Sequence, residues 1–215
     1  MSRKQKPEIP EKLLDALIRT VVEQGFSPGI DAIVHRAGVC KMSAYAKFDS
    51  RERMTVMAVE RVARVLVKNL DAALAGPPLH KICDDTGLPE VANCLARQLT
   101  DLDNPIGFIT ACLLGHPDPR SEINIAATKA HAHVVSWLEN FFSAEGVPSP
   151  QMVASTVMAM MHGTCASILA NHPDASSSII GAKSVMAAIF NAAVVELKRK
   201  VRYERSASKA KQKPG

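Results

Sequence analysis

The chain has 215 residues, of which 47% are hydrophobic and 22% charged, and its formal net charge is +5. These values predict a folded protein of one large or two small domains, and they exclude a disordered chain. The charge is uneven, because residues 1–64 carry +4, residues 65–195 carry −5 and residues 196–215 carry +6. Basic ends around an acidic middle suit a protein that contacts nucleic acid with one end; the alternative for the tail is simply solubility.

The N-terminal region begins with a short basic arm at residues 1–9, and no apolar run follows it, so no secretion signal is predicted. Proline is tolerated in the first turn of a helix, and Pro10 occupies such a position. A helix that ends at Gly25 is then predicted from apolar residues at helical spacing, namely Leu13, Leu14, Leu17, Ile18, Val21 and Val22.

Residues 29–48 have the pattern of a helix-turn-helix. The first helix places its apolar residues on one face and ends at Gly38, since glycine readily adopts the left-handed conformation of a tight turn. The second helix, residues 41–48, turns Ala44 and Phe48 inward. Its other side carries hydrogen-bond donors and cations at Lys41, Ser43, Tyr45 and Lys47. In this motif the second helix enters the major groove of DNA.

The segment AGVCKMSAYAKFDSRERM resembles the recognition segment of the TetR (tetracycline repressor) family, A-G-V-S-K-G-T-L-Y-x-H-F-x-S-K-E-x-L. The identical residues are Ala37, Gly38, Val39, Lys41, Tyr45, Phe48, Ser50 and Glu52. Departures from the pattern are Gly29 for a capping Thr or Ser, and Cys40, Met42, Ala44 and Lys47 for Ser, Gly, Leu and His. These departures mean that an operator sequence cannot be transferred from a relative.

The resemblance implies roles for individual residues. Tyr45 and Arg51 match phosphate-contacting positions of the family, and we expect Lys41, Ser43, Ala44 and Lys47 to face the groove. It also implies a DNA-binding domain at residues 7–69 and a helical domain at residues 70–203 for ligand binding and dimerisation. Residues 204–215 are expected to form a disordered basic tail.

The larger domain is also predicted to be all helical. The expected helices span residues 50–74, capped by Asp49 with Glu52, then 88–102, 108–114 and 122–144. The segment GFITACLLGHPDPRSE resembles a recurring family stretch in which a short helix ends in a Pro-Asp-Pro loop. No strand pattern or internal repeat is present.

Two further helices are expected at residues 150–170 and 178–202. The first has small residues four apart, at Ser155, Ala159, Gly163 and Ser167, and the second has an apolar face that includes Met186 and Phe190. Internal core packing would explain both. In the family, however, the last two long helices of each subunit form a four-helix interface, which implies a homodimer on a palindromic site.

An effector pocket is expected between the helix at residues 50–74 and the helices near Phe108 and Trp137. Its expected lining is mostly apolar, as in other ligand sites: Phe108, Cys112, His131, Val134, Trp137, Phe141, Met158 and His162. The net charge of −5 disfavours an anionic ligand and permits a neutral or cationic one. The alternative is that these residues are only core.

No enzymatic function is predicted, because no nucleophile elbow, metalloprotease motif or phosphate-binding loop occurs. The five cysteines are scattered and form no C-x-x-C pair, which indicates reduced thiols and a cytoplasmic location. Cys40, beside Lys41, is the one candidate redox thiol. No metal, cofactor or membrane span is expected, since the uncharged stretch at 151–173 contains many polar residues.

The sequence therefore predicts an all-α, homodimeric transcriptional regulator of the TetR type, in the family usually a repressor released by a small molecule. Activators also exist in the family, and the sequence has no feature that separates the two. One alternative is a small-molecule-binding protein with a vestigial helix-turn-helix, which the donors retained at residues 41–47 disfavour. Another is a non-specific architectural DNA binder, which the acidic middle of the chain disfavours.

Overall fold

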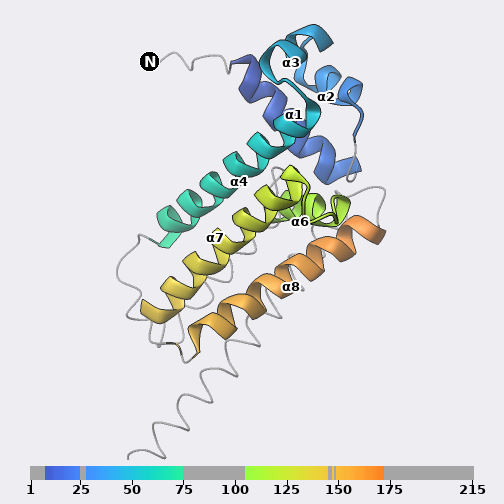
Figure 1. The fold of residues 1–215 in the computed structure, drawn as a ribbon. Coiled ribbons are helices and arrows are strands. Elements are labelled where there is room, and N and C mark those ends of the chain that lie inside the picture. Colours follow the sequence, from blue (N-terminus) through green and yellow to red (C-terminus); the bar gives the residue numbers. More distant parts are fainter. Residues whose placement is uncertain (1–7, 25–27, 75–104, 145–146, 148, 172–215) are drawn as a thin grey trace, which may run out of the picture.

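The computed structural model describes residues 8–24, 28–74, 105–144, 147 and 149–171. Every regular element in these ranges is a helix, which confirms the all-α prediction (Figure 1). The helices are α1 (Ile9–Gln24), α2 (Ile30–Ala37), α3 (Lys41–Lys47), α4 (Arg51–Leu74), α6 (Pro105–Gly115), α7 (Glu122–Ala144) and α8 (Pro150–Asn171). The helices predicted at residues 88–102 and 178–202, and the tail at 204–215, lie outside the described residues.

The first three helices form a compact head at one end of the molecule. The apolar stripe of α1 is buried, as predicted, and it packs against Ile33 and Val34 of α2 and against Ala44 and Phe48. The α2–α3 turn uses Gly38 at φ 64°, a left-handed conformation that residues with a side chain rarely adopt. The amide groups of Gly38 and Val39 donate to the carbonyls of His35 and Val34, and these bonds end α2 at the predicted position.

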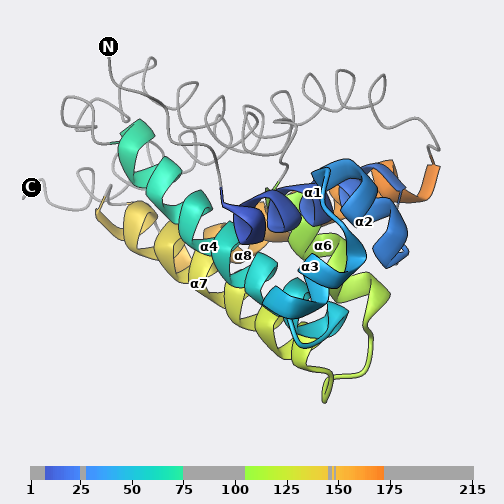
Figure 2. The ribbon, with the colours of Figure 1, turned by 90° about the horizontal axis from the view of Figure 1, so that it is seen from above.

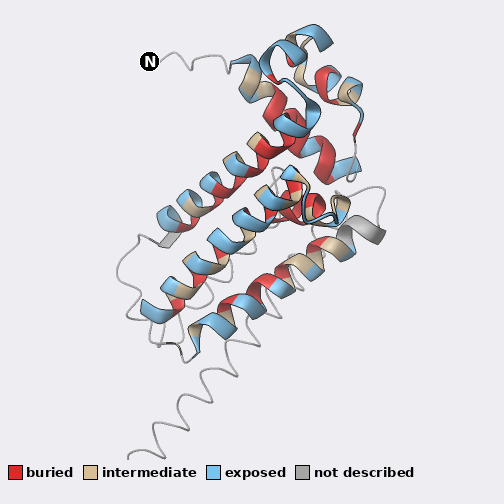
Figure 3. Cartoon of the chain, in the orientation of Figure 1, coloured by how far each residue is buried: buried red, intermediate tan, exposed pale blue. Residues whose placement is uncertain are grey.

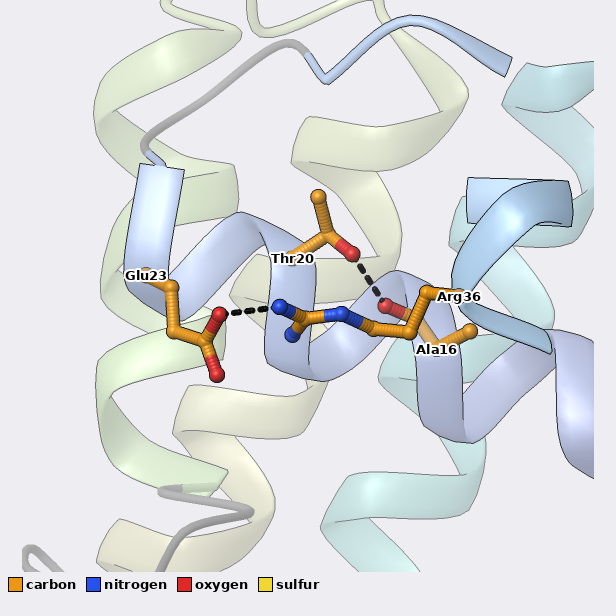
Figure 4. Close-up of polar contacts among 4 residues, drawn as sticks. All are labelled: Ala16, Thr20, Glu23 and Arg36. Carbon is orange, nitrogen blue, oxygen red and sulfur yellow. Dashed lines mark hydrogen bonds and ion pairs between the residues drawn. The ribbon is translucent and has the colours of Figure 1, made fainter. Parts of the chain in front are cut away.

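The head contains one ion pair between two helices and one buried hydrogen bond within α1. Arg36 of α2 forms an ion pair with Glu23 of α1, and Thr20 Oγ1 donates to the Ala16 carbonyl at 2.6 Å within α1 (Figure 4). The Thr20 side chain is buried, so this bond satisfies a hydroxyl that would otherwise be costly in the core. The ion pair is exposed and contributes at most about 1 kcal/mol.

The N-cap of α4 lies one residue later than predicted, because the helix begins at Arg51. Ser50 Oγ accepts a hydrogen bond of 3.0 Å from the Arg53 amide, and the Met54 amide donates to the Ser50 carbonyl. Ser50 is therefore the N-cap, and the predicted cap at Asp49 with Glu52 is wrong. The reason is local: a cap side chain reaches the amide three residues ahead, which from Ser50 is the third residue of the helix.

Helices α4, α6, α7 and α8 form the body of the molecule. Helices α4, α7 and α8 lie side by side along it, and α6 lies at the end nearest α1 (Figures 1 and 2). Their buried residues face one another, while the outward surfaces are exposed (Figure 3). Arg61 of α4 also forms an ion pair with Asp15 of α1, at 2.7 Å between Nη2 and Oδ1. Helix α4 thus contacts both the head, through α1, and the body, through α7.

Two hydrophobic clusters form the interior. The first joins the head to the body, because Phe108, Ile109 and Cys112 of α6 and Ala127 of α7 belong to the same cluster as the head residues. The second lies between α4, α6, α7 and α8 and contains Leu66, Leu70, Ile106, Val134, Leu138, Phe142, Ala154, Val157, Met158, Met161 and Cys165. The predicted domain boundary at residue 69 falls inside the continuous helix α4, and the division stays a prediction.

None of the helices described is long and apolar enough to cross a membrane.

Candidate nucleic-acid interface and effector site

The outer face of α3 is the candidate nucleic-acid interface. Ala44 and Phe48 anchor α3 to the head, because only 2% and 4% of their surfaces are exposed. On the other side, Lys41, Tyr45 and Lys47 are exposed and Ser43 is half-buried. The structure therefore places four of the predicted DNA-contacting residues on the accessible side of a helix whose inner side is fixed.

Ala44 corrects the predicted contact set. Its side chain is buried against α1, so it cannot reach a DNA groove. Met42, which the sequence-based set omits, is the most exposed large apolar residue of α3, with 83% of its surface exposed. The exposure of Met42 could have been predicted from helical spacing. Because Ala44 and Phe48 point inward, Met42, Tyr45 and Ala46 must share the outer face.

Lys41 is held by an acidic residue of α2. Its Nζ lies 2.9 Å and 3.1 Å from the two carboxylate oxygens of Asp31. This hydrogen bond raises the pKa of Lys41, so the side chain remains charged. Because the pair is exposed, a phosphate or base could displace Asp31 at small cost.

Arg51 lies where α4 begins, beside the start of α2. Its Nη1 donates to the Pro28 carbonyl at 3.2 Å. A guanidinium has five N–H donors, so this contact leaves donors for a phosphate oxygen. The first amides of α2 lie nearby, since Pro28 precedes the N-cap Gly29, which supplies no side-chain cap. Arg51 and this helix start form a surface suited to a phosphate.

Cys40 is the exposed N-cap of α3, and its Sγ lies 3.0 Å from Ser43 Oγ. Hydrogen bonding to the Ser43 side chain lowers the pKa of this thiol. Burial instead raises the pKa of Cys112 to about 12, which makes that thiol unreactive at neutral pH. A redox role for Cys40 stays a prediction.

The eight predicted effector-site residues divide into two groups. Phe108, Cys112, Val134 and Met158 are fully buried, the first two in the cluster shared with the head and the other two in the body cluster. The remaining four, His131, Trp137, Phe141 and His162, are half-buried. The structure thus divides the predicted residues between two hydrophobic clusters and does not bring them together into one site.

Trp137 and Phe141 are part of a contact between α7 and α4. Their rings stack with centroids 5.6 Å apart and planes 3° from parallel. Trp137 Nε1 donates to Asp71 Oδ1 of α4 at 2.7 Å. This bond joins α7 to α4, the helix that follows the head in the chain.

His131 and His162 form a polar chain with Thr110, which the sequence-based set omits. His131 Nδ1 lies 2.7 Å from His162 Nε2, and His162 Nδ1 lies 2.5 Å from Thr110 Oγ1. Burial lowers the pKa of both histidines; for His162, burial and then His131 lower it to about 4. Both rings are therefore neutral at pH 7. No sequence spacing links residues 110, 131 and 162, so only packing of three helices reveals the chain.

A groove of about 400 Å³ lies between α4 and α7. It is lined by Glu60, Ala63, Arg64, Ala126, Lys129, Ala130 and His133. None of the eight predicted effector-site residues lines this groove. Within the described residues no three metal-binding side chains come together.

The predicted dimer surface on α8 is accessible in the single chain. Ser155, Ala159, Gly163 and Ser167 are exposed, and a Cβ atom placed on Gly163 would meet no atom within 4 Å. Met186 and Phe190 lie outside the described residues. The interface stays a prediction.

The comparisons with known proteins give no match to family models or curated proteins, but they do give matches to solved structures. No protein-family model and no curated protein matches the sequence. The structure resembles the TetR-family regulator SCO4454 of Streptomyces coelicolor, with a TM-score of 0.69 and 15% identity over 90% of this chain and 95% of that one. The fold is that of the TetR-family regulators. A TetR-family regulator from Agrobacterium tumefaciens has a TM-score of 0.64 and 12% identity, covering 83% of this chain and 95% of its own.

A further similar structure, of a transcriptional regulator, was solved with a ligand. FadR of Bacillus subtilis, in complex with stearoyl-CoA, has a TM-score of 0.58 and 15% identity over 87% of this chain and 96% of its own. At these identities the comparisons establish the TetR fold, while the roles of individual residues must come from this chain's own geometry.

Proposed function

We propose that the protein is a sequence-specific, DNA-binding transcriptional regulator that uses α3 as its recognition helix. The observation that carries this proposal is the division of α3 into a buried side, Ala44 and Phe48, and an exposed side with Lys41, Tyr45 and Lys47. A helix held in this way presents cations and donors on a rigid support, as reading of the major groove requires.

Phosphate contacts would fix the register of the head on the duplex. Arg51 and the start of α2 supply N–H donors on one side of α3, and Tyr45 supplies a hydroxyl. In this arrangement Lys47 and Ser43 read base edges, and Lys41 exchanges Asp31 for DNA.

The proposal includes a homodimer that binds a palindromic operator with half-sites about one helical turn apart. It is supported by the exposed row of small residues at Ser155, Ala159, Gly163 and Ser167, which allows a helix of a second copy to approach closely. A dimer would also double the number of phosphate contacts. We propose a cytoplasmic location and no catalytic activity.

We further propose a small-molecule effector, bound in the body, that changes the position of the head and in the simplest case releases DNA. Helix α6 supports this coupling, since Phe108 and Cys112 share one core cluster with the head. The Trp137–Asp71 hydrogen bond supports it as well, because it connects α7 to α4. An effector regulates only if it favours one head position over the other. FadR of Bacillus subtilis, which has this fold, was solved with stearoyl-CoA.

Footprinting of the purified protein on the DNA upstream of its own coding sequence tests the proposal. We expect two protected half-sites related by a dyad, and protection that persists in the presence of excess random DNA. Protection of all fragments alike would favour the architectural DNA binder, and no binding to any fragment would favour the vestigial motif.

A further inference from the structure

The centre of the exposed face of α3 is apolar. Ala44 marks the buried side of this helix, because only 2% of its surface is exposed and it packs against the head. Each residue turns an α-helix by about 100°, so Met42 and Ala46 lie about 160° from Ala44, one on each side. Both are exposed, Met42 with 83% of its surface, and residues four apart are neighbours on a helix. Met42 and Ala46 therefore form an apolar row that points most directly away from the head.

The two lysines of α3 lie to the sides of this apolar row. Lys41 and Lys47 are each three residues from Ala44, which places them about 60° from the buried direction. The contact made by Lys41 agrees with this position, because its Nζ lies 2.9 Å from a carboxylate oxygen of Asp31 in α2, within the same head. The lysines therefore bring positive charge to both sides of the row, which complements the negative charge of DNA.

The two hydroxyl groups of α3 also lie beside the apolar row. Ser43 and Tyr45 are about 100° from Ala44, on opposite sides of the helix. Ser43 is half-buried, and its Oγ lies 3.0 Å from Cys40 Sγ at the start of the helix. Tyr45 is exposed, with 48% of its surface accessible. All residues of α3 are described, and none with an N–H or O–H donor in its side chain points along the direction of the apolar row.

A recognition helix in the major groove turns its outermost side chains toward the edges of the bases. These edges carry hydrogen-bond donors and acceptors, and thymine adds an apolar group, its C5-methyl. The thioether of Met42 is only a weak acceptor, and Ala46 has no polar atom in its side chain. A polar base edge under Met42 would lose water without gaining a hydrogen bond, which is unfavourable, whereas burial of a methyl group is favourable.

We propose that Met42 is a specificity-determining residue that selects thymine by contact with its C5-methyl group, at one position in each operator half-site. This inference rests on the proposed function, since it names a base that the recognition helix selects. Ala46 continues the apolar surface beside this contact, and its small side chain lets the helix approach the bases closely. Met42 occupies the position at which the TetR pattern has glycine, so the contact is a property of this chain.

The test begins with selection of binding sites from random, unmethylated DNA by the full-length protein. Thymine is the only base of such DNA that carries a C5-methyl group. Each thymine of the selected site is then replaced by deoxyuridine, which keeps the base pair and lacks only that methyl group. At one position of each half-site, the replacement should weaken binding of the wild-type protein about 4-fold, the factor expected for one buried methyl group. Met42→Ala should bind the two forms of DNA equally.

Two further variants show whether residue 42 acts through the chemistry of its side chain. Met42→Leu remains apolar and should keep the response to deoxyuridine. Met42→Gln should lose this response and select adenine at the same position, because glutamine can bond two groups on the edge of adenine. Val65→Ala, which shortens an exposed apolar side chain of α4, is the matched control and should respond as the wild type does. Met42 is exposed, so its variants should have the melting temperature of the wild type.

Three outcomes would overturn the inference. They are a selected site without thymine, a wild-type protein that no deoxyuridine replacement weakens, and a Met42→Ala variant that shows the same loss as the wild type. In the last case the methyl group would act through the shape of the DNA or through another residue. In all three cases a selected sequence exists, so the proposed regulatory function stands. If the protein selects no sequence at all, the proposed function fails and the inference fails with it.

Discussion

Trp137 donates its indole N–H to the Asp71 carboxylate, and this 2.7 Å bond is a direct polar link between the body helix α7 and the connecting helix α4. Trp137 is the only tryptophan of the chain, so its fluorescence reports on this single junction. Trp137 fluorescence thus reports on the contact through which a conformational change in the body would reach α4 and the head.

Removal of the acceptor in Asp71→Ala should change Trp137 emission and loosen α4 against α7. The link is exposed, so we expect a loss of unfolding free energy of no more than about 1 kcal/mol. The effect on DNA release by any effector should be larger than this small loss would indicate. Asn69→Ala, two residues earlier on the exposed side of α4, is the control and should leave the emission unchanged. Identical emission spectra of both variants and the wild type would show that the bond is not formed in solution.

The start of α4 gives a second prediction. Ser50→Ala should lower the free energy of unfolding by about 1 kcal/mol, because the Arg53 amide loses its cap. Asp49→Ala should change it by less than about 0.5 kcal/mol, as is usual for exposed positions. Urea denaturation of the two variants checks this order. A larger loss of stability in Asp49→Ala than in Ser50→Ala would show that Asp49 is the N-cap, as predicted from the sequence.

Gly163 gives a third prediction, on the dimer. A Cβ atom at this position meets no atom of its own subunit within 4 Å, and the substitution removes a helical glycine, so Gly163→Leu should fold at least as stably as the wild type. It should nevertheless dissociate the dimer, because the added side chain separates two closely packed helices. Sedimentation velocity measures this, with Gly163→Ala as a milder variant that should remain dimeric. A Gly163→Leu protein that stays dimeric would place the interface elsewhere.

Acidic pH gives a fourth prediction. The pKa of His162 is lowered from 6.5 to about 4 in the folded protein. Between these values the unfolded chain binds a proton that the folded chain does not, so stability falls as the pH drops through this window. His131, whose pKa is also lowered by burial, contributes in the same direction. Protonation of His162 would also remove the one lone pair through which its neutral ring accepts a hydrogen bond in its contacts with Thr110 and His131.

The measurement is urea denaturation at pH 7 and pH 5 for the wild type and His162→Gln. Carboxylates titrate in both proteins, so their contribution cancels in the comparison. The variant should lose less stability on acidification than the wild type. An equal loss in both proteins would show that His162 does not titrate with a lowered pKa.

The fold was predictable because its signals are local. Helical spacing of apolar residues located α1, and Gly38 marked the end of α2, since one residue's backbone freedom decides that turn. The limits predicted for α7, residue 122 to about residue 144, agree with the structure. The choice of cap was local as well, but Asp49 and Ser50 both suit a cap, and only the position of the Arg53 amide distinguishes them.

The candidate sites were less predictable because they depend on packing. The face of α3 followed from helical spacing, yet Ala44 was assigned both to the core and to the groove, and burial decides for the core. The chain through Thr110 joins residues 52 positions apart, and no periodicity connects them. Half of the predicted effector-site residues proved to be core, because apolar side chains in a sequence do not reveal whether they face a cavity or one another.

The comparison of Lys47→Ala with Arg51→Ala tests most directly whether α3 reads DNA. Each variant would be used to select sites from random DNA, and its affinity would be followed from 50 to 200 mM salt. We predict that Lys47→Ala changes the selected sequence, whereas Arg51→Ala keeps the sequence, weakens binding to all DNA, and reduces the salt slope by about one unit. If both variants lower affinity for selected and random DNA equally, with no change in the selected sequence, α3 is not the recognition helix.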